Sequence, residues 1–295
     1  MKYSQAQSRH VRKVTTARTF QGHVSFQRRS VSFARHPVSF QRRVVSLILL
    51  TLLIVSVACR GTRAPATSVP ELTVAAAADL TPAFEEVGRA FEAEQKTKVV
   101  FVFGSTGLLT RQIENGAPFD VFAAANVSYI DQLDQKGLIV PGSKRIYARG
   151  RITLWTTADT ALKIEKIEDL ARPDVHRIAI ANPDHAPYGQ AARQALEAAR
   201  IWETVRPKLV YGDNIRQTLQ FAETGNVEVA IVALSLSAQS KGRWVLVPEE
   251  LHQPLDQGMG IIKGTNNEQA ARAFSDFVNG QKGREIMKKY GFSFQ

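Results

Sequence analysis

Four short turns in this sequence stand where a buried strand is expected to end and a helix to begin. They are Ala78-Asp79, Ser105-Thr106, Pro187-Tyr188 and Asn214-Ile215. The first amide groups of a helix have no intrahelical acceptor and carry a partial positive charge, so each turn can donate hydrogen bonds to an anion. Four such turns around one cleft would suit a small oxyanion. For each turn taken alone, the alternative is an ordinary helix cap.

No catalytic motif is indicated. The segment Gly104-Ser105-Thr106-Gly107 lacks the Gly-x-Ser-x-Gly spacing of a nucleophile elbow, and neither His-Glu-x-x-His nor Gly-x-x-x-x-Gly-Lys occurs. The histidines outside the leader are His176, His185 and His252. They are scattered, so we expect them to be solvated or structural rather than metal ligands. We therefore expect a binding protein, not an enzyme, with no cofactor and no metal-cation ligands.

The elements that must position these turns alternate along the chain. Strands are expected at 72–77, 98–103 and 118–124, and helices at 81–94, 108–115 and 127–136. Thr81 and Pro82 suit the N-cap and the first position of the first helix. This β-α-β-α order predicts an α/β fold with a mostly parallel sheet flanked by helices, and the carboxyl ends of such strands are where ligands bind.

The second half continues the alternation. Strands are expected at 151–155, 177–181, 208–211, 229–233, 245–247 and 258–262, and helices at 167–170, 188–199, 215–224, 236–240, 268–279 and 281–290. A single sheet of this size would be long, so we expect two α/β lobes with a ligand cleft between them. Lobe I is expected to comprise 71–147 plus 258–295, and lobe II 148–257.

The charge of the chain is concentrated at its start. Residues 1–43 hold ten Lys or Arg and no acid, so the rest has 28 basic against 27 acidic side chains although the whole chain carries +11. Phosphate binding needs a lasting basic surface, so nucleic acid is not an expected partner. Residues 24–29 recur as 38–43 (Val-Ser-Phe-Gln-Arg-Arg). This segment is either translated upstream sequence, with initiation nearer Arg42, or an extended leader.

A fifteen-residue apolar segment, 44–58, leads directly to Cys59, the only cysteine. At about 1.5 Å per residue it spans roughly 22 Å, shorter than the ~30 Å hydrocarbon core, and is typical of a signal peptide. The pattern resembles a bacterial lipoprotein signal, with acylation of Cys59 after cleavage. Residues 1–58 are thus expected to be leader and signal peptide, and 59–70 a lipid-anchored linker at the periplasm or cell surface. The alternatives are an ordinary secretory signal or an uncleaved anchor.

Several segments resemble the molybdate-binding protein of bacterial ABC importers. They are Ala75–Phe84, Phe103–Gly107, Arg111–Phe122, Asn182–Gly189 and Lys289–Phe292. The resemblance covers 71–295, in the family's order and spacing. It implies a two-lobed class II periplasmic-binding-protein fold that holds molybdate or tungstate through neutral hydrogen bonds. It also implies delivery of the anion to an ABC permease of the inner membrane, and a monomeric protein.

By position, the resemblance makes Ser105 a hydroxyl and amide donor and the turn Ala78-Asp79 a donor from lobe I. It makes Tyr188 and Ile215 backbone donors from lobe II. Sulfate, phosphate or a small organic acid are the alternative ligands. A ligand-sensing domain of a transcription regulator or an enzyme on the same fold are alternatives of another class, and residues 1–70 hold no helix-turn-helix that the former would need.

The sequence departs from the family at two positions. Asp79 stands where many members have serine, and Ala233 where many have a tyrosine whose hydroxyl contributes to the site. We expect the Tyr188 hydroxyl to offset the second loss. A carboxylate is repelled by a nearby dianion, so we expect Asp79 to turn away from the ligand and cap the helix that follows.

Overall fold

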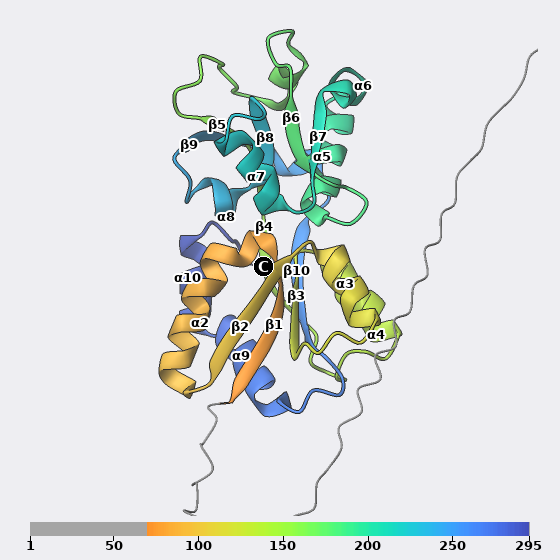
Figure 1. Cartoon of the computed structure of the whole chain (residues 1–295), viewed down its shortest axis with the longest axis vertical. Coiled ribbons are helices and arrows are strands. Elements are labelled where there is room, and N and C mark those ends of the chain that lie inside the picture. Colours follow the sequence, from red (N-terminus) through yellow and green to blue (C-terminus); the bar gives the residue numbers. More distant parts are fainter. Residues whose placement is uncertain (1–69, 295) are drawn as a thin grey trace, which may run out of the picture. The chain divides into compact units, whose positions relative to one another are not determined.

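The computed structural model describes residues 70–294, which form two five-stranded sheets, each with helices on both sides (Figure 1). We call each sheet with its helices the first and the second lobe. The predictions for the leader, the signal peptide, Cys59 and the linker up to residue 69 lie outside the described residues. Within residues 70–294, no helix is long and apolar enough to cross a membrane.

The first lobe is built on a sheet of strand order β2-β1-β3-β10-β4. Its strands are β1 (Glu71–Ala77), β2 (Lys98–Gly104), β3 (Val121–Ala124), β4 (Arg145–Gly150) and β10 (Leu255–Ile261). Helices α2 (Thr81–Gln95), α9 (Glu268–Asn279) and α10 (Gln281–Lys289) cover one face, and α3 (Thr106–Glu114) and α4 (Val127–Gln135) the other. Phe84 and Phe91, one helical face of α2, pack edge to face against Phe274 of α9.

The second lobe is built on a sheet of strand order β7-β6-β8-β5-β9. Its strands are β5 (Ile152–Thr157), β6 (Ile178–Ala181), β7 (Leu209–Gly212), β8 (Val229–Ala233) and β9 (Gly242–Leu246). Its helices are α5 (Pro187–Ala198), α6 (Trp202–Val205), α7 (Ile215–Glu223) and α8 (Leu234–Ser237). Short 3-10 helices are η1 (Ala78–Leu80, in the first lobe), η2 (Ile167–Ala171), η3 (Arg206–Lys208) and η4 (Glu249–Leu251).

The α/β two-lobe prediction is confirmed, and in each sheet four of the five strands run in the same direction while one runs against them. In the first, β1 pairs in parallel with β2 and β3, whereas β10 runs antiparallel to β3 and β4. The second repeats this arrangement, with parallel β6 pairs and antiparallel β5 pairs. The strands that run against the others are β5, where the chain enters the second sheet, and β10, where it returns to the first. The predicted lobe boundaries, 147/148 and 257/258, fall inside β4 and β10, and the division itself stays a prediction.

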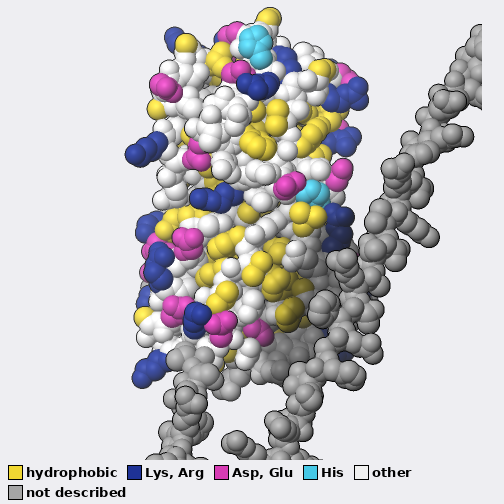
Figure 2. Space-filling model, in the orientation of Figure 1, with side chains coloured by type: hydrophobic (Ala, Val, Ile, Leu, Met, Phe, Trp, Pro, Cys, Tyr) yellow, Lys and Arg dark blue, Asp and Glu magenta, His cyan; other side chains and the backbone are white. Residues whose placement is uncertain are grey.

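Charged side chains of both signs are interspersed on the face shown in Figure 2, where apolar side chains gather over the β1–β2 region of the first lobe. Edge strand β2 carries one exposed large apolar side chain, Val102. The view shows no single-sign region of the kind that phosphate binding would use.

Candidate functional site

The five residues expected to bind a ligand all border one cavity between the lobes. The cavity is narrow, with a volume of about 10 Å³. The lining residues come from the ends of strands and the starts of helices in both lobes: Ala77, Ala78, Asp79, Gly104, Ser105, Thr106, Ala125, Ala186, Pro187, Tyr188, Asn214 and Ile215. The topology therefore brings together all four turns that were singled out in the sequence.

Each turn reaches the cavity because it follows the end of a strand, either directly or after a short loop. Strand β1 leads directly into η1, and β2 into α3 at Ser105. In the second lobe, Pro187 and Tyr188 open α5, and Ile215 opens α7. Asn214 caps α7 by accepting hydrogen bonds from the amides of residues 216 and 217, which leaves the amide of Ile215 outside the cap. These first-turn amides are the donors that an anion would use.

Ser105 joins the two lobes through His185, which lies in the loop before α5. The Ser105 hydroxyl donates to the His185 carbonyl oxygen at 2.7 Å, and its oxygen lies 2.9 Å from His185 Nδ1. Because the hydroxyl has one hydrogen, Nδ1 must be the donor of the second bond. The amide of Gly107 also donates to the His185 carbonyl oxygen, at 2.8 Å. The lobes are thus in direct contact at this side of the cavity.

Asp79 does not cap the following helix, so that expectation was wrong. Neither η1 nor α2 has a side-chain cap hydrogen bond. Instead Asp79 Oδ2 accepts hydrogen bonds from the Tyr188 hydroxyl at 3.0 Å and from Gln257 Nε2 at 2.5 Å. Asp79 is fully buried, and its Oδ1 has no hydrogen-bond partner among the described residues. The carboxylate therefore points toward the interface between the lobes.

The same contacts correct the role expected of the Tyr188 hydroxyl. Its hydrogen is donated to Asp79, and its oxygen accepts from Gln257 at 3.1 Å. In this arrangement the hydroxyl holds Asp79 and is not available to replace the tyrosine missing at Ala233. The Tyr188 backbone amide lies at the second position of α5.

A buried polar network surrounds Asp79. Tyr147 of β4 donates to Gln257 Oε1 at 2.8 Å, and the Ser235 hydroxyl of α8 donates to the Asp79 carbonyl oxygen at 2.8 Å. Tyr147, Gln257 and Ser235 are all less than 4% exposed. The network thus joins η1, β4 and β10 of the first lobe to α5 and α8 of the second lobe.

Burial dominates the electrostatics of this network. Desolvation raises the pKa of Asp79 from 3.8 to about 6, although hydrogen bonds from Gln257 and Tyr188 oppose it. Burial also raises the pKa of Tyr147 and of Tyr188 well above the usual value, so both hydroxyls stay neutral at physiological pH. No Lys, Arg or His is among the residues that border the cavity. A bound anion would meet neutral donors and one carboxyl group.

Three polar residues of the site were missed by sequence reasoning: Tyr147, Gln257 and Ser235. Gln257 and Ser235 are 178 and 156 positions from Asp79, so no local spacing connects them. His185 was noticed only within a family motif and as a structural histidine. Its pKa is lowered, first by burial and then by the charge of Arg111. No group of three potential metal-ligating side chains occurs in the part of the chain that the structure describes.

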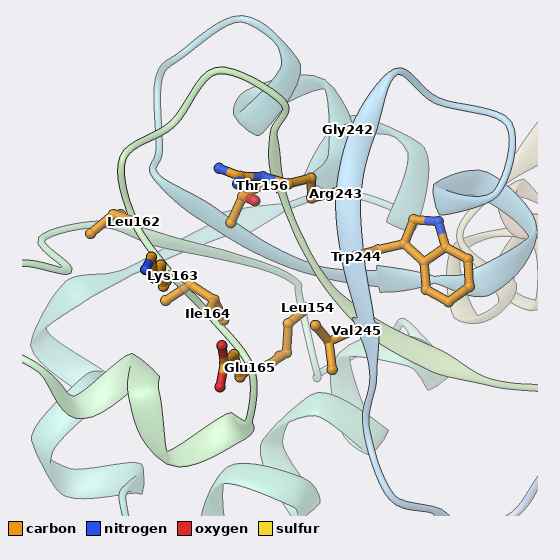
Figure 3. Close-up of a pocket in the computed structure, with 10 residues that line it drawn as sticks. All are labelled: Leu154, Thr156, Leu162, Lys163, Ile164, Glu165, Gly242, Arg243, Trp244 and Val245. Carbon is orange, nitrogen blue, oxygen red and sulfur yellow. The ribbon is translucent and has the colours of Figure 1, made fainter.

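A larger groove lies on the second lobe, away from these residues (Figure 3). Strand β9 and the loop after β5 border it, and its volume is about 640 Å³. Lys163, Glu165 and Arg243 supply charges of both signs, and Trp244 points away from the other labelled side chains. None of the predicted site residues lines this groove. The interlobe cavity is therefore the candidate site.

Two α/β lobes that meet over a cavity bordered by helix-start amides define a solute-binding protein of the two-lobed kind. The chain belongs to the bacterial extracellular solute-binding protein family, whose family model matches residues 72–293. Members of this family bind solutes rather than catalyse reactions, in agreement with the expectation from the sequence.

Named relatives agree with the resemblance found in the motifs. The molybdate-binding protein ModA of Rhodobacter capsulatus is 36% identical over 75% of this chain and 88% of its own length. That of Azotobacter vinelandii is 36% identical over 80% of this chain and 94% of its own. The solved structure of the Azotobacter vinelandii periplasmic molybdate-binding protein matches with a TM-score of 0.73, at 29% identity, covering 76% of this chain and 99% of that one. The predicted resemblance is thereby confirmed.

Proposed function

We propose that this protein is the extracytoplasmic receptor of an ABC importer and that it traps molybdate or tungstate between its lobes. The observation that carries this proposal is the convergence of four helix-start turns, two from each lobe, on one cavity with no Lys or Arg at its border. Such a site binds an anion through neutral, fixed donors. The names of the 36% identical relatives favour molybdate over other oxyanions.

The donors proposed are the residues predicted from the sequence. The amides of Ala78 and Asp79 act from the first lobe, and those of Tyr188 and Ile215 from the second. Ser105 adds its amide and its hydroxyl, whose hydrogen would turn from the His185 carbonyl oxygen toward the anion. Six or seven charge-assisted hydrogen bonds, each worth about 1.5–3 kcal/mol, can offset desolvation and give submicromolar binding, about −8 kcal/mol or better.

Delivery and anchoring complete the proposal. Lobe closure over the anion creates the form that an inner-membrane ABC permease recognises, and the protein acts as a monomer. Acylation of Cys59, outside the described residues, holds it at the membrane facing the periplasm or cell exterior. No resident cofactor is required, because trapping and release involve no covalent chemistry.

Elemental analysis and titration test the proposal. The purified protein is first assayed for bound molybdenum and tungsten, and is then titrated by calorimetry with molybdate, tungstate, sulfate and phosphate at constant ionic strength. We expect submicromolar binding of molybdate and tungstate and binding of sulfate and phosphate at least a hundredfold weaker. Tighter binding of sulfate, phosphate or a small organic acid would replace the proposed ligand.

A further inference from the structure

Asp79 is the one acidic group at the border of the interlobe cavity, and the trapping of an anion does not itself use its side chain. Oδ2 is fully engaged by Tyr188 and Gln257. Oδ1 is buried and has no partner within residues 70–294. An unpartnered buried oxygen is costly, and more so when it carries charge. A proton on Oδ1 removes that charge and turns the atom into a donor.

The groups facing the carboxyl group offer no compensating positive charge. From α5 and β4 the titratable groups are Tyr188 and Tyr147, which are neutral hydroxyls. From β10 comes the Gln257 amide, and from α8 the Ser235 hydroxyl, both uncharged. Helix α7 contributes apolar Ile215, and its neighbour Arg216 is exposed. An ionised Asp79 beside a bound dianion would leave two like charges in a space without a cation.

We propose that binding of a tetrahedral dianion in this cavity is coupled to uptake of one proton from solvent by Asp79. The protonated carboxyl group then donates a hydrogen bond from Oδ1, and Oδ2 keeps its bonds to Tyr188 and Gln257. Asp79 thereby determines the pH range in which the receptor traps its anion. This inference rests on the proposed function, since it assigns a further residue to the same site.

The charge balance of the free protein fits such coupling. In the free protein, burial outweighs the hydrogen bonds from Gln257 and Tyr188 and raises the pKa of Asp79 to about 6, and a dianion in the cavity shifts the same pKa further upward. At a pH between the two values, the free protein has an ionised Asp79 and the complex a protonated one. Linkage then requires that affinity falls as pH rises, by up to about tenfold per pH unit.

The test is calorimetric titration of the purified protein with molybdate from about pH 6.5 to about pH 8.5, each pH in two buffers of different ionisation enthalpy. Sulfate, at higher concentration, serves as a second dianion. We expect the wild type to lose affinity by about tenfold per pH unit over part of this range and to take up close to one proton near pH 7.5. Asp79→Asn should bind without proton uptake and, near pH 8.5, at least about tenfold more tightly than the wild type.

Two controls separate this coupling from general effects. Asp184→Asn removes an exposed carboxylate in the loop before α5. This variant should keep both the decrease of molybdate affinity with pH and the proton uptake of the wild type. Ser105→Ala should weaken molybdate binding by a similar factor at every pH, so the decrease of affinity with pH should stay the same. Asp79→Ser provides a second neutral variant if Asp79→Asn folds poorly.

The outcomes distinguish this proposal from the one on which it rests. Submicromolar molybdate binding by the wild type with no proton uptake, or with the same uptake in Asp79→Asn, overturns the coupling and leaves the receptor function standing. Binding of no oxyanion by either protein at any pH overturns both.

Discussion

The Tyr188 hydroxyl on the second lobe donates a hydrogen bond of 3.0 Å to the Asp79 carboxylate on the first. Both residues are buried. Removing the hydroxyl by Tyr188→Phe leaves the carboxylate with Gln257 alone, so the free energy of unfolding should fall by about 1.5–3 kcal/mol at pH 7. Chemical denaturation measures this. Tyr211→Phe, at an exposed tyrosine of β7, should change stability by less than about 0.5 kcal/mol. Equal effects of the two variants would contradict the interlobe role of Tyr188.

Ser105→Ala tests the serine that contacts both the second lobe and the cavity. The variant removes the bond from the hydroxyl to the His185 carbonyl oxygen, so we expect a stability loss of about 0.5–1.5 kcal/mol. Molybdate affinity should fall about ten- to a hundredfold, since a hydrogen bond to a charged ligand is also lost. Calorimetry and thermal unfolding report the two effects.

Ser143→Ala is the matched control for Ser105→Ala. Ser143 is a buried serine of the first lobe whose hydroxyl bonds the Val140 carbonyl oxygen. It does not border the cavity, so the variant should lose stability but keep molybdate affinity. Unchanged titration curves for Ser105→Ala would mean that Ser105 only joins the lobes.

The stability of the unliganded protein should depend on pH through Asp79. Its pKa is raised by burial from 3.8 to about 6 in the folded state, so between these values the folded protein holds a proton that the unfolded chain has released. The free energy of unfolding therefore falls as pH rises through this window, by up to about 3 kcal/mol. Asp79→Asn should be more stable than the wild type at pH 7 by most of this amount and have no such advantage at pH 4. Urea denaturation at both pH values gives the difference in free energy of unfolding between the variant and the wild type. The same difference at pH 4 and pH 7 would refute the raised pKa of Asp79.

Membrane attachment is tested at Cys59, outside the described residues. Several acyl chains on one cysteine contribute about 0.8 kcal/mol per buried CH₂, enough for stable anchoring. Cys59→Ser should therefore move the protein from the membrane fraction to the soluble fraction, whereas Ser56→Ala should not. Fractionation and immunoblotting measure this. If Cys59→Ser stays with the membranes as the wild type does, the lipid anchor is wrong.

Local pattern was sufficient to predict many of the elements. The helix expected at 268–279 is α9, and those expected at 81–94 and 127–136 differ from α2 and α4 by one residue at the carboxyl end. Each has apolar residues at helical spacing, a signal that depends on neighbours only. The turns of the site were predictable for the same reason, since a strand end followed by a helix start is local in sequence.

Contacts between distant segments could not be predicted. Strand β4 was not expected as a strand, because its residues Arg145–Gly150 are held by antiparallel pairing with β10, more than one hundred positions away. The orientation of Asp79 was wrong for the same reason. Helix capping is the local choice for a carboxylate at a helix start, but Gln257 and Tyr188 provide donors that only the folded chain brings near. Tertiary hydrogen bonds prevailed over the local preference.

Gly150 offers the sharpest test of the interlobe contact. It is the last residue of β4, and a Cβ atom there would collide with the Tyr188 hydroxyl oxygen and lie 3.1 Å from Gln257 Nε2. Gly150→Ala should therefore displace the hydroxyl from Asp79, prevent full closure of the lobes and lower molybdate affinity by about tenfold or more. Small-angle scattering with and without molybdate measures closure, and calorimetry measures affinity.

The double variant with Tyr188→Phe identifies the cause of that loss. Because the main collision is with the hydroxyl oxygen, its removal should relieve most of the effect of Gly150→Ala. The two changes should then be non-additive, with an interaction energy of at least about 1 kcal/mol in a double-mutant cycle. Additive losses would show that Gly150 is needed for its backbone conformation or for Gln257, and that the Tyr188 hydroxyl does not depend on the absence of a side chain at this position.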